Sequence, residues 1–245
     1  MKKGWILSGV IIVLTALAMA CGDSATSVPV TTSDESVLTA TPTAVSTPTP
    51  KARATARPTP TPLPPGFIVD STADVVDANP GDGICDDGSG NCTLRAAIME
   101  ANASPGADTI NLSADTYILS IPGTNPLRIT DDLTINGAGA RATIIDADRL
   151  YRVILIDVPS TVGFFRMAIQ NGESETGGGI SNEDGTLTLI DSFVSGNSAE
   201  ERGGGILNLV GGQLTLKNSR VNSNTADRFG GGIFNQNSTL TVTDS

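Results

Sequence analysis

The chain of 245 residues contains no histidine, few aromatic residues (4%) and only three cysteines. Without histidine, acid–base mechanisms that depend on an imidazole are excluded, and a zinc site is disfavoured. Basic residues are also few, with 15 Lys and Arg against 26 Asp and Glu. This acidic balance disfavours nucleic acid as a partner and favours a soluble surface. After the N-terminal apolar run no other is long enough to span a bilayer, so we expect the folded part to lie outside the membrane.

A repeat of 26 to 27 residues fills the C-terminal part of the sequence. Gly-Gly-Gly-Ile occurs at Gly177–Ile180, Gly203–Ile206 and Gly230–Ile233. Between these copies Leu-Thr-Leu also recurs, at Leu187–Leu189 and Leu214–Leu216. A fixed period of this size indicates a stack of similar supersecondary units.

Each repeat alternates apolar and polar residues, as half-buried strands do. We expect three strands of about three to five residues per repeat, separated by Gly, Asn, Asp and Ser turns. One such unit cannot bury its apolar face alone, but units stacked at about 4.8 Å can. The sequence therefore predicts an all-β fold, a parallel β-helix. Earlier, less regular coils are expected at Leu133–Ile135, Thr143–Ile145 and Val153–Ile156.

Asparagine and aspartate recur at fixed positions of the repeat. They form either a polar binding strip or structural ladders, and we favour ladders because Asn and Asp suit turns and stacked amides bond to one another. The triple glycines are expected to provide positive φ or close approach between coils. The three registers are Asn182, Asn208 and Asn235; Asn197 and Asn224; and Asp191, Asn218 and Asp244.

Residues 1–21 read as a signal peptide, with Met1-Lys2-Lys3 followed by an apolar run to Ala20. An uncleaved membrane anchor is the alternative. Residues 22–66 are rich in Thr, Pro, Ser and Ala, and are expected to form a disordered spacer because they offer too little apolar surface for a core. The spacer threonines are open candidates for O-linked sugars.

Two of the three cysteines, Cys85 and Cys92, lie in the folded part of the chain and have six residues between them. In an exported protein such a pair is expected to form a disulfide. We predict no metal or cofactor. Calcium is kept as an alternative because four aspartates lie nearby, although their spacing matches no EF-hand. These are Asp77, Asp82, Asp86 and Asp87.

A helix is predicted over Thr93–Asn102, with Thr93 as its N-cap and apolar residues on one face. Such a helix, placed before a solenoid, is expected to cover the first coil. We therefore divide the folded part into an N-terminal cap region, residues 67–130, and β-helix repeats, residues 131–245. Because the third repeat ends before its final strand, we expect further repeats in the native product.

Two resemblances cover about residues 67–245. Cys92-Thr93-Leu94-Arg95-Ala96-Ala97, with the preceding Asp82–Asp86 segment, resembles the CSLREA domain. The Gly-Gly-Gly-Ile-x-Asn and Leu-Thr-Leu segments resemble repeats of polymorphic outer-membrane and pectin-lyase-like proteins, which implies a right-handed parallel β-helix. Residues 17–22, Leu-Ala-Met-Ala-Cys-Gly, resemble a lipoprotein cleavage site, which implies lipidation of Cys21. Ala96 replaces the family's glutamate, so only the hydroxyl half of a capping box remains.

The pectin-lyase-like fold includes polysaccharide lyases and hydrolases, and carboxylate pairs would be needed for hydrolysis. Carbohydrate binding also favours exposed aromatics, and alternation places Phe193 outward beside Arg220 of the next coil. We favour an extracytoplasmic, surface-displayed scaffold for adhesion or binding, with a carbohydrate-active enzyme as the alternative. Its expected partners are the membrane, through a lipid or signal anchor, and a surface polysaccharide or a protein of a host or neighbouring cell. The candidate catalytic residues are Asp146, Asp148, Arg149 and Arg152.

Overall fold

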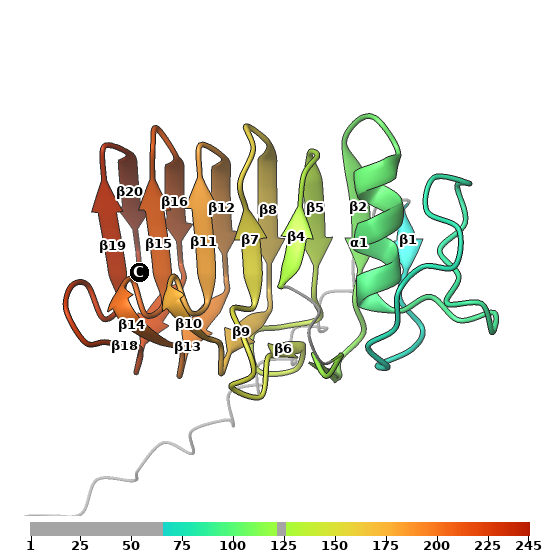
Figure 1. The fold of residues 1–245 in the computed structure, drawn as a ribbon, viewed down its shortest axis with the longest axis horizontal. Helices are drawn as coiled ribbons and strands as arrows, with labels where there is room; N and C mark the ends of the chain where they lie inside the picture. The colour runs from blue at the N-terminus through green and yellow to red at the C-terminus, as the bar shows by residue number, and fades with distance from the viewer. Residues whose placement is uncertain (1–65, 122–125) are drawn as a thin grey trace, which may run out of the picture. The chain divides into compact units, whose positions relative to one another are not determined.

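A computed structural model describes residues 66–121 and 126–245 (Figure 1). The chain winds through stacked coils in which every named strand pair is parallel. The predicted all-β parallel β-helix with a short N-terminal helix is therefore confirmed. The predicted signal peptide, Cys21 and most of the spacer lie outside the described residues.

Four sheets, numbered in the order in which a coil visits them, run along the stack. Sheet 1 has the order β1-β2-β5-β8-β12-β16-β20, sheet 2 β3-β6-β9-β13-β17, sheet 3 β10-β14-β18 and sheet 4 β4-β7-β11-β15-β19. The strands of sheet 1 are Phe67–Ile68, Asp108–Asn111, Leu133–Asn136, Thr161–Phe165, Thr186–Ile190, Gln213–Lys217 and Thr239–Thr243. Those of sheet 2 are Thr116–Ile118, Ile144–Asp146, Ala168–Gln170, Phe193–Ser195 and Arg220–Asn222. Those of sheet 3 are Glu173–Thr176, Ser198–Arg202 and Thr225–Ala226. Those of sheet 4 are Leu127–Ile129, Ile154–Ile156, Ile180–Glu183, Ile206–Leu209 and Ile233–Gln236.

Equivalent residues of successive coils pair with one another, so side chains form columns. On sheet 1 one inward column includes Ile110, Ile135, Phe164, Leu189 and Leu216 of successive coils. All five are buried in one core cluster, which is the continuous interior expected from stacking. At the last strand, β20, Leu240 and Val242 of the inward columns are 38% and 52% exposed.

Two expectations about the coil need correction. Three of the coils contain a fourth strand, because sheet 3 lies between sheets 2 and 4. Its sequence, such as Ser198–Arg202, carries charges instead of the apolar alternation on which the prediction depended. The coils also begin before residue 131, since β2 and β4 already pair with strands of the next coil.

The N-terminal cap is built around α1 (Leu94–Ala103), which begins one residue after its predicted start. Thr93 caps the helix by accepting a hydrogen bond from the Ala96 N–H at 3.1 Å. The apolar face of α1 joins the core cluster, and α1 contacts β2 and β4 of the first coil. The helix therefore covers the end of the stack, as its amphipathic pattern predicted.

An ion pair inside the cap was not predicted. The Arg95 guanidinium lies 2.6 Å from Asp74, and both side chains are almost fully buried. Asp74 also accepts hydrogen bonds from the Ser120 and Ile121 N–H groups, which ties the cap to the loop after β3. Glu100, also buried, accepts from the Gly81 N–H at 2.6 Å and from the Gly83 N–H. The N-terminal loop is therefore fixed to α1 by charge-assisted bonds.

The triple glycines play both expected roles. The first of each triplet has a positive φ, for example 59° at Gly177 and 64° at Gly203. The second packs against the next coil, because a Cβ on Gly178 would collide with the Ser198 carbonyl oxygen. Any larger residue at Gly178 would push the backbones apart.

Candidate functional sites

The repeated asparagines of sheet 4 form an interior ladder. Asn182 Nδ2 donates to Asn208 Oδ1 at 2.7 Å, and Asn208 Nδ2 donates to Asn235 Oδ1 at 2.7 Å. Each also donates to a carbonyl in its own turn, that of Gly185, Gly212 or Ser238. Asn182 and Asn208 are fully buried. These residues therefore hold coils together and do not form an exposed binding strip.

The other repeated polar residues behave in the same way. Asn197 Nδ2 donates to Asn224 Oδ1 at 2.9 Å. Ser219 Oγ accepts from the Ser192 N–H at 3.2 Å, and forms a further ladder that the sequence did not suggest. Asn218 Nδ2 bonds to Asp191 Oδ1 in the third register. Asp191, Asn218 and Asp244 have φ values of 52°, 48° and 54°, in agreement with the turn role expected of Asn and Asp.

The candidate catalytic turn after β6 is occupied by structural contacts. Asp146 Oδ2 accepts from Gln170 Nε2 at 2.8 Å and from Asn171 Nδ2 at 2.9 Å, both in the next coil. Its Oδ1 accepts from the Asp148 N–H at 2.9 Å. Asp148 and Arg149 adopt φ values of 48° and 58° within the turn.

Arg152 binds the end of β10 in sheet 3 and the residue that follows it. Its Nε donates to the Gly177 carbonyl at 2.9 Å, and its Nη2 donates to the Thr176 carbonyl at 2.5 Å. Burial lowers the pKa of Arg152, while the charge of Glu183 opposes that shift. Of the four candidate residues, Asp146 and Arg152 are therefore both engaged in contacts within the protein.

The four aspartates of the N-terminal loop bind their own backbone. Asp77 accepts from the Asn79 and Asp86 N–H groups, and Asp86 from those of Gly88 and Gly90. Asp82 accepts from the Ile84 N–H. In residues 66–121 and 126–245, no three His, Cys, Asp or Glu side chains are grouped as metal ligands would be. The geometry of this loop gives the calcium alternative no support.

Asp87 has a pKa that is lowered by the hydrogen bonds it accepts. It accepts from the Ser89 hydroxyl at 2.6 Å and the Ser89 N–H at 2.8 Å, and bonds from Asn91 add to these. These bonds to the ionised form lower its pKa to about 2.

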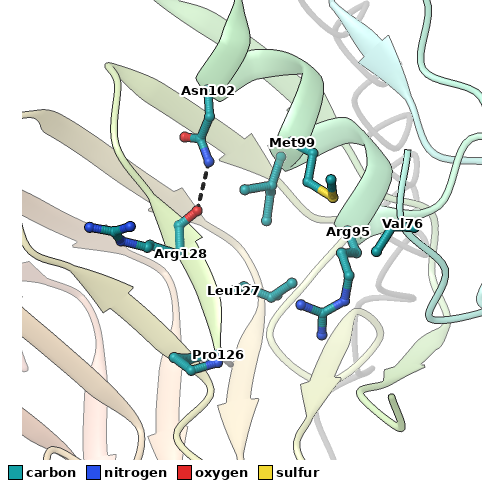
Figure 2. Close-up of a pocket in the computed structure, with 8 residues that line it drawn as sticks. Val76, Arg95, Met99, Asn102, Pro126, Leu127 and Arg128 are labelled. Atoms are coloured by element: carbon teal, nitrogen blue, oxygen red, sulfur yellow. Dashed lines mark hydrogen bonds between the residues drawn. The ribbon is translucent and has the colours of Figure 1, made fainter. Parts of the chain in front are cut away.

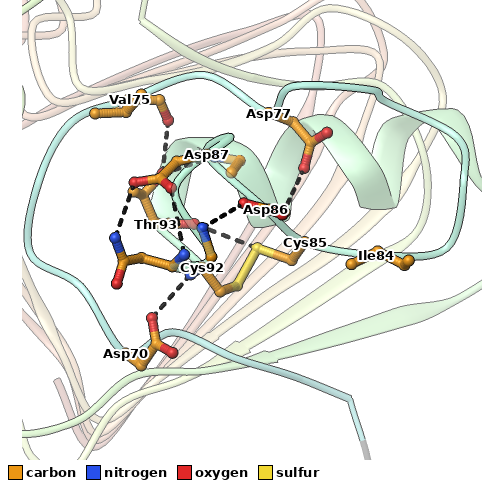
Figure 3. Close-up of a disulfide and its surroundings, with 12 residues drawn as sticks. Asp70, Val75, Asp77, Ile84, Cys85, Asp86, Asp87, Cys92 and Thr93 are labelled. Carbon is orange, nitrogen blue, oxygen red and sulfur yellow. Dashed lines mark hydrogen bonds between the residues drawn. A yellow bond between two sulfur atoms is a disulfide. The ribbon is translucent and has the colours of Figure 1, made fainter.

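The predicted disulfide between Cys85 and Cys92 is present (Figure 3). It lies immediately before α1, beside the Thr93 cap, and Cys92 N–H donates to Asp70 Oδ1 at 2.8 Å. The Thr93 hydroxyl donates to the Val75 carbonyl at 2.6 Å. The disulfide thus closes the loop at the point where the cap meets the helix.

A pocket of about 260 Å³ lies between α1 and β4 (Figure 2). Ile98, Met99 and Leu127 make it largely apolar, and Asn102 bridges its two walls by donating to the Arg128 carbonyl at 2.8 Å. Residues 122–125, which precede its lining residue Pro126, lie outside the described part of the chain. We therefore assign no ligand to it.

Half-exposed aromatic side chains form three outward features, of which the sequence suggested one. Phe193 faces outward with Arg220 of the next coil 5.6 Å above its ring, as predicted from alternation. Arg202 lies 5.4 Å from the Phe234 ring centroid and 6.0 Å from that of Phe229. Phe165 is the third, and projects from the outer face of sheet 1. The Arg202 group was missed because pairing between coils brings its members together, and Phe165 was missed because its position depends on the glycine at Gly163.

The sequence matches no protein-family model, no curated protein and no solved structure. The resemblances to the CSLREA domain and to pectin-lyase-like repeats therefore remain predictions. No helix within the described ranges is both long and apolar enough to cross a membrane.

Proposed function

We propose that this chain is an extracytoplasmic β-helix scaffold displayed at the cell surface, where it acts in binding or adhesion. A lipid on Cys21 would anchor it and residues 22–66 would hold it away from the membrane. The observation that carries the proposal is the disulfide between Cys85 and Cys92, which closes the cap of the solenoid. Structural disulfides persist in oxidising compartments outside the cytoplasm.

The internal bonding of the coils supports a scaffold. Ladders through Asn197, Ser192 and Asn208 bond the coils of the Gly-Gly-Gly-Ile repeats to one another, so these repeats form a regular frame. Solenoids of this kind present extended outer surfaces whose side chains are set by register. Binding is consistent with the aromatic side chains carried on those surfaces.

The alternative is a polysaccharide lyase or hydrolase. A hydrolase needs two carboxylates on either side of the scissile bond. Asp146, one of the candidate carboxylates, instead uses both oxygens to hold its turn and the next coil. This contact favours the scaffold over the enzyme.

The test is to express the full chain in a bacterial host and to compare it with Cys21→Ser. If the protein is displayed at the surface, mass spectrometry should find a lipid-modified N-terminal cysteine. Protease added to intact cells should also digest the protein. The Cys21→Ser variant, which cannot carry the lipid, should be found in the soluble fraction and not in the membrane fraction. Protein that stays inside the cell and unmodified would contradict the proposal, and release of soluble sugars from polysaccharides would favour the enzyme.

A further inference from the structure

We infer that the outer face of sheet 1 around Phe165 binds a neutral glycan. The inference rests on the proposed binding function and adds to it a position and a ligand class.

Phe165 is placed on this face by the glycine two residues before it. Phe164 is fully buried in the interior, so Phe165 points outward and is half-buried. Gly163 shares the outward side, and a Cβ at that position would lie 2.6 Å from Cε2 of Phe165. The ring therefore leans back along its own strand over the space that the missing side chain leaves. One side of an aromatic ring is thus supported by the sheet.

Threonines flank Gly163, over which the ring lies, whereas the register partners of Phe165 itself are Asn136 and Ile190. Gly163 pairs with Thr134 in the preceding coil and with Thr188 in the following one. The same outward column continues to Thr215 and Thr241. Neighbouring members lie about 4.8 Å apart, the ordinary strand spacing. A second outward column, about 6.8 Å away along the strands, contains Thr161, Thr186, Gln213 and Thr239.

The face carries little charge in a strongly acidic protein. Strands β5, β8, β12, β16 and β20 contain one charged side chain, Lys217, whereas the chain has a net charge of −11. An anionic ligand would be repelled by the protein as a whole and would gain one positive partner here. A neutral ligand is not repelled.

A neutral sugar ring fits these features chemically. One face of a pyranose presents C–H groups, which pack on an aromatic ring, and its rim presents hydroxyls that donate and accept hydrogen bonds. A threonine hydroxyl can do both. Binding sites combine an apolar or aromatic surface with a few placed polar groups, and Phe165 with its threonines supplies that combination.

The other aromatic features are less suited to this ligand. An arginine guanidinium lies over the Phe193 ring, and another lies over Phe229 and Phe234. A sugar stacking on those rings would have to displace a favourable cation–π contact. Phe193 therefore provides a matched control, as an outward, half-buried phenylalanine on a different sheet.

The experiment uses the purified full chain, its retention on insoluble neutral polysaccharides (cellulose, xylan, mannan) and calorimetry with their oligosaccharides. Polygalacturonate is the charged comparison. We expect Phe165→Ser to weaken binding at least about tenfold, and Thr188→Val about three- to tenfold. Phe165→Tyr should bind within about threefold of the parent, and Phe193→Ser should bind as the parent does. Thermal melts report whether each variant folds.

Thr188→Val keeps the inference testable if Phe165→Ser does not fold, because valine has the shape of threonine without its hydroxyl. Equal losses in Phe165→Ser and Phe193→Ser, or retention on polygalacturonate alone, would overturn the inference. So would a Phe165-dependent dimer on size exclusion without glycan binding, since the face would then join two copies of the chain. The binding assay uses purified protein, so its result does not depend on where the protein is located in the cell. Absence of glycan binding would therefore not contradict surface display, and absence of surface display would not contradict glycan binding.

Discussion

The cap and the repeats of this protein are stabilised in different ways. In the cap, each contact occurs once: the disulfide Cys85–Cys92, the buried pair Arg95–Asp74, and the hydrogen bonds that Glu100 accepts from the loop glycines. In the repeats the same weak contact recurs in each coil, as in the ladder through Asn182 and Asn208.

This difference follows from what each region must do. An internal coil has a neighbour on both sides, so one bonding pattern can be repeated. The first coil has no complete coil on its outer side, so the short strand β1, which pairs with β2, and α1 with its loop cover that end by contacts that occur once. Asn182 shows where the repeating pattern begins, because its register partner in the preceding coil is Ile156 and its buried Oδ1 has no hydrogen-bond partner. Four experiments would break or sharpen this comparison.

The largest effect is expected from breaking the buried ion pair of the cap. Asp74→Ala removes the carboxylate from the buried Arg95 guanidinium, and should lower the free energy of unfolding by about 3–5 kcal/mol. Asp157→Ala is the control, since its partner Arg128 is 56% exposed, and should cost less than about 1 kcal/mol. Urea unfolding of both variants measures the difference. Equal losses would contradict a special role for the cap pair.

Loss of the disulfide should have the next largest effect. Cys85→Ser with Cys92→Ser is expected to cost about 2–3 kcal/mol, because the unfolded loop is no longer closed. Hydrogen exchange should increase in residues 66–121 and stay unchanged in β11–β16. A Cys21→Ser variant should show neither change, which separates the disulfide from the third cysteine. Exchange that rises equally throughout would show that cap and repeats unfold together.

A smaller effect is expected from one step of the ladder. Asn208→Ala removes bonds to both neighbouring coils from a fully buried site, and should cost about 1–3 kcal/mol. Asn235→Ala, at an exposed position of the same ladder, should cost less than about 1 kcal/mol. Thermal melts of the two variants rank them. The reverse ranking would mean that the ladder does not stabilise the coils.

The smallest effects concern pH and have opposite signs in two aspartates. The lowered pKa of Asp87, about 2, contributes stability above the unfolded value of 3.8 that is lost as the pH falls through about 2. Burial, with the nearby charges of Asp131 and Glu100, raises the pKa of Asp108. That contribution is present below pH 3.8 and is lost as the pH rises through the raised pKa. Asp108→Asn should therefore stabilise the protein slightly at neutral pH and not at acid pH, as measured by melts. NMR titration of the Asp87 carboxyl checks its separate midpoint.

The fold could be predicted from sequence wherever the physical signal was local. Alternation in Leu187–Leu189 places alternate side chains in the core, and Thr93 before an apolar stripe starts a helix. The recurrence of Asn182 and Asn208 predicted a ladder because equal spacing in a solenoid places residues in contact. These interpretations needed only period and residue type.

What could not be predicted depends on register between coils or on loops that fold back. Asp74 meets Arg95 across 21 residues with no repeat to align them. Sheet 3 was missed because Ser198–Arg202 carries too much charge to read as a strand. The position of the outward Phe165 ring depends on the absence of a side chain at Gly163. In the sequence alone, a glycine at that position only weakens the strand pattern.

The close packing of glycines between coils has a consequence for how the molecule can vary in length. Gly178 packs against Ser198 of the next coil, and Gly204 packs against Thr225 of the coil after that. Successive coils therefore pack on one another through the same backbone contact. A duplicated segment of one full repeat would make the same packing contact with the coils on both sides. An insertion of a few residues within a glycine triplet would disrupt that contact. Recombination between repeats can therefore lengthen or shorten the stack in whole units and leave Arg95, Cys85 and the rest of the cap unchanged. The length of the outer surface of the solenoid can thus change without any change in the cap.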